Sequence, residues 1–229
     1  MKKKSTENKS VSEMLKDRSL LKQDVYEITQ ETFTLFKETL QKEVEKIKEN
    51  ISDDRVRTNV DDKGRFEAHA YVGSDVLLFN MHTNVFCFPK ESAVWKTSYV
   101  QEDHQRAYCG VINIYNFLAD SFIQGRVNDP GYLIGRIFVN KDKHFIVEGE
   151  GRLGFLYRDF INGELTENVM SAIIETAICH AAEFDLLVPP YDIVNVVNVM
   201  QMQTMSSSLQ MKTGKRLGFK FQSDSDEII

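Results

Sequence analysis

The histidines and acidic residues are the side chains of this sequence best suited to catalysis. A carboxylate beside a histidine raises its basicity and suits it to general-base work, and Asp103-His104 is such a pair. No histidine lies in an H-x-H or H-E-x-x-H spacing, so no metal site is predicted. The weak catalytic candidates are His82, His104 and Asp120, which could converge only in the folded chain.

Polar side chains interrupt the apolar stretch Asn113-Ile114-Tyr115-Asn116. In a strand, Asn113 and Tyr115 would face one side and Asn116 the other. A buried amide has to be hydrogen-bonded, so each either braces the fold or contacts a ligand. We take Asn113, Tyr115 and Asn116 as the candidate ligand-binding residues, with a purely structural role as the alternative.

The sequence has three cysteines, Cys87, Cys109 and Cys179. They form no C-x-x-C pair, and their odd number argues against a disulfide framework. Free buried thiols in a reducing compartment are the expectation. Cys87 lies between two phenylalanines, which favours the core over a nucleophilic role.

One stretch, Gly149-Glu150-Gly151-Arg152-Leu153-Gly154, spells G-x-G-x-x-G. A dinucleotide site needs a strand before this motif and a helix N-terminus after it. Here the following Phe155-Leu156-Tyr157 predicts another strand, and Glu150 would repel a phosphate. We interpret the glycines as a turn and predict no cofactor.

The elements that must position these residues begin with an amphipathic helix, predicted over 22–51, after a short helical stretch from Ser12 to Leu21. Its apolar residues recur at three- and four-residue steps, the period of a helix with one apolar face. This face either packs on the protein's own sheet or forms the seam of a homodimer, and both can hold together. The residues are Val25, Ile28, Phe33, Phe36, Leu40, Val44, Ile47 and Ile51.

After a charged connector, Ser52 to Gly64, alternating residues predict a meander of strands at 66–72, 76–79 and 84–88. The stretch 107–122 fits strand or helix, and we favour a strand followed by a helix or turn. Tyr132–Val139 and His144–Glu148 form a predicted β-hairpin around a four-residue loop.

Thr166 can cap a largely apolar helix, predicted over 166–185. We expect residues 1–10 to be disordered and residues 11–222 to form one domain, with the core of the sheet at 65–160. A C-terminal hairpin at 191–222, in which 191–205 is strand or helix, precedes an acidic tail at 223–229. This order predicts an α+β fold, an antiparallel sheet flanked by helices. The order alone resembles GAF and PAS sensory modules, which hold a ligand between sheet and helices.

Composition excludes some classes of protein. With 28 Lys and Arg against 34 Asp and Glu, the net charge of −6 argues against nucleic-acid binding. No stretch reaches the roughly 18 apolar residues that a membrane span needs. The polar residues after Met1-Lys2-Lys3-Lys4 give no export signal, so we expect a cytoplasmic protein.

These features favour a non-catalytic module that binds a small molecule or a protein partner, as a homodimer through residues 22–51. The first alternative is an enzyme with a dispersed site that uses His82, His104 and Asp120. The second is a structural subunit that docks into a larger assembly through its N-terminal helix. The sequence indicates neither the ligand nor the pathway.

Overall fold

The computed structural model describes residues 10–156, 160–161, 163–185, 191, 196 and 198–200. In this part of the chain, seven strands form one antiparallel sheet, and helices flank it. This confirms the predicted α+β class. The predicted N-terminal disorder and the acidic tail at 223–229 lie outside the described residues, as does most of the predicted hairpin at 191–222.

The sheet is a meander in which each strand pairs with its neighbour along the chain, in the order β1-β2-β3-β5-β6-β7. The short β4 pairs instead with the first residues of β5, where Phe86 lies opposite Cys109. The strands are β1 (Thr58–Asp62), β2 (Glu67–Val72), β3 (Asp75–Met81), β4 (Phe86–Cys87), β5 (Tyr108–Leu118), β6 (Tyr132–Asn140) and β7 (Phe145–Gly149).

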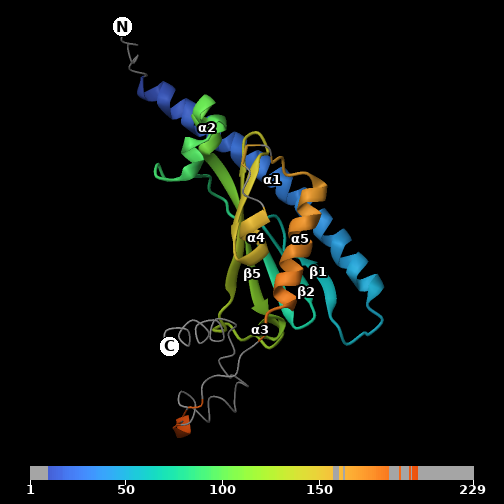
Figure 1. Ribbon diagram of the computed structural model, residues 1–229. Helices are drawn as coiled ribbons and strands as arrows, with labels where there is room; N and C mark the ends of the chain where they lie inside the picture. The colour runs from blue at the N-terminus through green and yellow to red at the C-terminus, as the bar shows by residue number, and fades with distance from the viewer. Residues whose placement is uncertain are drawn as a thin grey trace, which may run out of the picture.

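Two long helices, α1 (Val11–Asn50) and α5 (Glu167–Ala182), lie side by side on one face of the sheet (Figure 1). We call this the helix face, and the opposite one the outer face. The short helices η1 (Ala93–Lys96), α2 (Ser98–Glu102) and η2 (His104–Ala107) lie at one end of the sheet, α3 (Ala119–Ile123) lies at the other, and α4 (Gly151–Leu156) follows β7.

The first helix is longer than its predicted span of 22–51, because it absorbs the short helical stretch before it. It starts with a capping box, in which the Glu13 amide donates to the Ser10 hydroxyl and the Ser10 amide donates to the Glu13 carboxylate at 2.9 Å. No Gly or Pro interrupts the chain between this cap and Asn50, so nothing ends the helix earlier.

The apolar stripe of α1 packs on the chain's own sheet. Phe33, Phe36 and Leu40 are fully buried, and the Phe36 and Phe79 ring centroids lie 5.3 Å apart. Homodimerisation through 22–51 therefore stays a prediction, and a second copy would have to contact the other side of this helix.

A buried carboxylate joins α1 to α5. Glu43 accepts hydrogen bonds from Lys46 at 2.7 Å and from the Ser171 hydroxyl at 2.5 Å. These two bonds hold the pKa of Glu43 below its usual value, although burial acts in the opposite direction. The charged form thus keeps the two helices in register, beside an exposed ion pair between Lys42 and Glu167.

The helix comes very close to the sheet where Thr29 crosses Gly110 of β5. The Thr29 hydroxyl donates to the Val25 carbonyl at 2.6 Å, so it is satisfied although fully buried. A Cβ atom on Gly110 would lie only 2.7 Å from the Thr29 Cβ. Glycine is therefore required at this crossing.

Some predicted elements differ from the structure. β1 lies inside the predicted connector 52–64, because its sequence Thr-Asn-Val-Asp-Asp lacks the alternation that marks a strand. The strand predicted at Phe155–Leu156 is wrong, because these residues end α4. The stretch 107–122 is strand β5 followed by α3, as favoured from the sequence.

The G-x-G-x-x-G stretch is not the predicted turn, because it runs from the last residue of β7 into α4. It does not form a dinucleotide site either, since α4 is only six residues long and the sheet is antiparallel. Close packing explains its glycines, because a Cβ on Gly154 would overlap the Gly149 carbonyl. No helix in the described ranges combines the length and apolarity needed to cross a bilayer.

The crossing of Thr29 and Gly110 predicts the effect of one added methyl group. We expect Gly110→Ala to lower the free energy of unfolding by about 1–3 kcal/mol, because the overpacked helix has to move away from β5. Urea denaturation measures this change.

The matched control is Gly135→Ala in the neighbouring β6, where the nearest atom to the new Cβ would be 3.5 Å away. We expect this variant to change stability by less than about 1 kcal/mol. Equal losses in both variants would contradict the close approach of α1.

Candidate functional site

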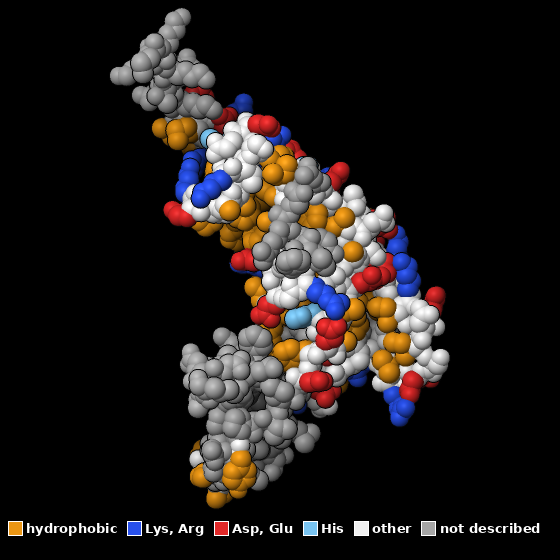
Figure 2. All heavy atoms as spheres, in the orientation of Figure 1, with side chains coloured by type: hydrophobic (Ala, Val, Ile, Leu, Met, Phe, Trp, Pro, Cys, Tyr) orange, Lys and Arg blue, Asp and Glu red, His pale blue; other side chains and the backbone are white. Residues whose placement is uncertain are grey.

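A groove of about 840 Å³ lies on the outer face of the sheet, near its α2 end. Its floor is formed by β5, β6 and β7, and its wall by the segment that runs from β4 into η1. In Figure 2, hydrophobic side chains gather on the surface just below the region that Figure 1 labels α2. The volume falls within the range of roughly 300–1,000 Å³ that is typical of small-molecule sites.

The pairing register arranges the floor of the groove in two rows. Residues directly opposite each other in antiparallel strands share a face of the sheet. The apolar row consists of Val111, Phe138 and Ile146. The polar row lies two residues further along each strand, on the same face of the sheet. It consists of Asn113, Arg136 and Glu148, and it continues into β3 with Asn80.

The wall of the groove is aromatic. Phe88 packs on Phe138 with 5.0 Å between ring centroids, and the indole N–H of Trp95 donates to the Phe88 carbonyl at 2.9 Å. The Lys90 ammonium lies 4.6 Å from the centroid of the Trp95 ring. These contacts fix the wall beside the floor.

The polar groups of the groove have unused hydrogen-bonding capacity. Asn113 makes no side-chain hydrogen bond to another described residue, although it is half-buried. The Arg136 guanidinium donates to Glu148 and lies 5.5 Å from the Phe138 ring centroid. His82 packs its ring on Phe86 with centroids 4.8 Å apart, and its Nδ1 accepts the Asn84 amide at 3.0 Å.

Two cysteines line the groove, and both thiols are weak nucleophiles there. Burial raises the pKa of the Cys109 thiol, and it also raises the pKa of Cys87. Cys87 is exposed at the wall, so the prediction that it belongs to the core is wrong. The two-residue strand β4 lies beyond the end of β3, and both of its residues are exposed.

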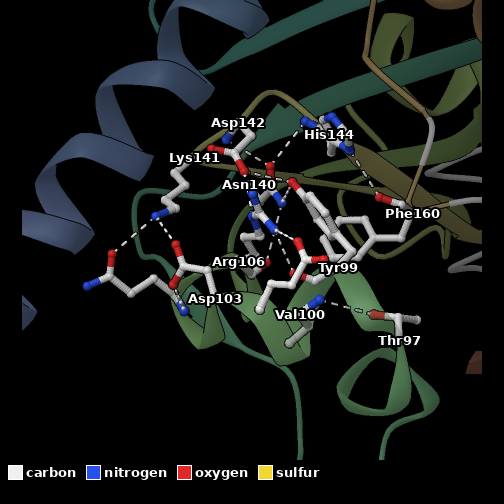
Figure 3. Close-up of polar contacts among 12 residues, drawn as sticks. Thr97, Tyr99, Val100, Asp103, Arg106, Asn140, Lys141, Asp142, His144 and Phe160 are labelled. Atoms are coloured by element: carbon white, nitrogen blue, oxygen red, sulfur yellow. Dashed lines mark hydrogen bonds and ion pairs between the residues drawn. The ribbon is translucent and has the colours of Figure 1, made fainter.

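A network of polar contacts ties the α2 region to the β6–β7 loop (Figure 3). Asp142 accepts hydrogen bonds from the Tyr99 hydroxyl and from the Arg106 Nε, each at 2.9 Å. The Asn140 amide donates to the Tyr99 hydroxyl at 2.9 Å. His144 stacks on the Tyr99 ring with 4.7 Å between centroids.

Charges in this network keep its donors and acceptors fixed. Burial and the bond to Asp142 raise the pKa of Tyr99 to about 12, although Asn140 acts in the opposite direction. The phenol therefore stays a donor at neutral pH. Lys141 holds the pKa of Asp103 below its usual value, which keeps a second ion pair between the same two segments.

The three predicted ligand-binding residues do not share one site. Asn113 lines the groove, and Tyr115 lies on the same face of the sheet, two residues further from the α2 end. Asn116 lies opposite Leu77, in the core of the helix face, where its side chain is buried. Its carbonyl oxygen has no hydrogen-bond partner among the described residues.

The three catalytic candidates are also separated. His82 lines the groove, and His104 packs its ring on Trp95 with centroids 5.7 Å apart. Asp120 lies in α3, past the far end of β5. His82 donates its amide to the Val111 carbonyl, and about seven strand residues at roughly 3.3 Å each separate Val111 from Leu118, so α3 begins about 23 Å away.

Sequence reasoning missed Arg136, Phe138 and Glu148. The signal that could have found them is the predicted β-hairpin, in which Arg136 and Glu148 interrupt two apolar strands. Pairing these strands around the four-residue loop puts the two charges opposite each other. The described residues contain no group of three His, Cys, Asp or Glu side chains placed to hold a metal ion.

No family model matches the chain, and no curated protein or solved structure shows detectable similarity to it. The resemblance to GAF and PAS modules therefore stays one of element order, and the site has to be interpreted from its own geometry.

The network around Asp142 predicts which interactions hold the α2 region in place. We expect Asp142→Ala to lower the free energy of unfolding by about 1–2 kcal/mol, because it leaves the Tyr99 hydroxyl without its acceptor and removes the hydrogen bond of the Arg106 Nε. Amide hydrogen exchange over 98–107 should become faster than in the parent protein.

The matched control is Asp61→Ala, which removes an exposed ion pair with Lys63. This pair should contribute between about 0 and 1 kcal/mol, and its loss should leave exchange over 98–107 unchanged. Unaltered exchange in Asp142→Ala would show that other contacts hold the region.

Proposed function

We propose that this protein is a non-catalytic binding module that holds one small, mostly apolar molecule in the groove on the outer face of its sheet. The observation that carries the proposal is the groove itself, about 840 Å³ of space bordered by aromatic and aliphatic side chains with a polar row at one side. Ligand sites of this type combine a large apolar surface with a few polar groups that fix orientation.

The architecture supports a preformed site. The floor consists of paired strands, and the wall packs on it through Phe88 and Phe138. The Trp95 indole bonds to the Phe88 carbonyl, and the Tyr99–Asp142 network holds the adjoining α2 region. Fewer side chains then lose freedom when a ligand binds, which lowers the entropic cost of association.

The geometry favours binding over catalysis. The Nδ1 of His82 accepts a hydrogen bond from the Asn84 backbone amide, and burial raises the pKa values of both cysteines in the groove. A general base needs an unprotonated nitrogen within hydrogen-bond reach of the proton that it removes. Asp120, the carboxylate of the enzyme hypothesis, lies at the opposite end of β5.

An uncharged fluorescent probe, N-phenyl-1-naphthylamine, tests this proposal. We expect saturable binding of one probe per chain, because the apolar row and the aromatic wall enclose it. Ala93→Trp introduces a large side chain at the wall and should weaken probe binding at least about tenfold, by filling the groove. Fluorescence titration of the full chain measures both affinities.

The control for this experiment is Ala182→Trp, which adds the same side chain at the exposed end of α5. This variant should bind the probe as the parent does. Absence of saturable binding, or equal affinities in the two tryptophan variants, would overturn the proposed function.

A second candidate, docking into a larger assembly, has one specific observation in its favour. The first turns of α1 expose Val11, Met14 and Leu15, with exposed fractions of 76%, 48% and 63%. Their three- and four-residue spacing puts them on one face of the helix, as in helices that dock in grooves.

A further inference from the structure

Three side chains that line the groove, His82, Arg136 and Asn113, can donate hydrogen bonds to a bound molecule. The His82 ring shows this most clearly, since its Nδ1 accepts the Asn84 amide and carries no proton. The neutral imidazole then has its proton on Nε2, which makes that nitrogen a donor. Because the side chain of His82 lines the groove, this donor is available to a bound molecule.

Arg136 and Asn113 add further donors on the polar row. They lie directly opposite each other on β6 and β5. One terminal nitrogen of Arg136 donates to Glu148, and the remaining N–H groups of the guanidinium make no hydrogen bond to another described residue. The amide of Asn113 is likewise unused in the described part of the chain. A group with two acceptor oxygens can bond to both residues at once.

The charge balance of the row limits how negative that group can be. Glu148 already offsets the charge of Arg136 and would repel an approaching anion. A dianionic phosphate ester would meet more repulsion than a single carboxylate. Beside the row, Val111, Phe138 and Ile146 provide an apolar floor for a hydrocarbon body.

We infer that the ligand of the groove is a hydrophobic monocarboxylic acid, bound as its carboxylate by Arg136, Asn113 and the Nε2–H of His82. The inference rests on the proposed function and gives its ligand a chemical class. The carboxylate accepts charge-assisted hydrogen bonds at the polar row, while the aromatic or aliphatic body of the acid lies on the apolar row of Val111, Phe138 and Ile146.

A matched pair of probes tests the inference, 1-naphthaleneacetate and its uncharged amide, 1-naphthaleneacetamide. They share one hydrocarbon body and differ in the charge of the polar end. We expect the acid to displace N-phenyl-1-naphthylamine from the parent protein at about one-tenth of the concentration that the amide requires. Competition titrations at fixed ionic strength give the two affinities.

Arg136→Met should abolish this preference, so that acid and amide bind alike. Retained amide binding in this variant shows that the groove has kept its shape. The control is Arg152→Gln in α4, which removes an exposed charge outside the groove and should keep the preference.

Two failures are distinguishable. If the neutral probe binds the parent but acid and amide compete equally, or if Arg136→Met keeps the preference, the carboxylate assignment is wrong while the binding module stands. If no probe binds the groove, the proposed function is wrong, and so is this inference, which rests on it.

Discussion

The close contact between α1 and the middle of the sheet is the interaction on which the rest of the structure depends. At Thr29 and Gly110 the helix lies against the backbone of β5, because the glycine has no side chain and the threonine hydroxyl bonds to its own helix. Phe33, Phe36 and Leu40 then bury their side chains fully against the same face. Burial of this kind contributes roughly 25 cal/mol per Å² of apolar surface.

This one-sided packing is what leaves the outer face available for a site. With α1 and α5 together on the helix face, the alternating side chains of β5, β6 and β7 line the floor of the groove on the other face. The segment from β4 to η1 closes one side of that floor, and the network at Tyr99, Arg106 and Asp142 holds the adjoining α2 region to the β6–β7 loop. The core and the groove are thus two sides of one sheet.

Much of this fold is predictable from the sequence, because its elements have strong periodic patterns. The stripe of α1, the β6–β7 hairpin and the apolar helix α5 follow from period and turn chemistry alone. β1 was missed because its five residues are mostly polar and take their pairing from β2. The helix α4 was missed because its residues Phe155 and Leu156 favour strands locally, while the packing of Gly149 on Gly154 turns the chain into a helix.

The candidate site is less predictable, since it depends on which strands are neighbours. Asn113 was found through its type, as an amide in an apolar strand, but its partners Arg136 and Glu148 lie 23 and 35 positions later in the chain. Asn116 is also an asparagine within an apolar stretch of sequence, but its side chain faces the core. Only the register separates the two amides, and one step along a strand moves a side chain to the other face.

The central claim is that the outer face carries the ligand site, and NMR titration of the full chain with 1-naphthaleneacetate tests it most directly. The account predicts that backbone amide signals shift over 82–94, 111–113, 136–138 and 146–148, while those of the buried stretch of α1 stay in place. Shifts confined to α1 and α5, or no saturable shifts at all, would contradict it.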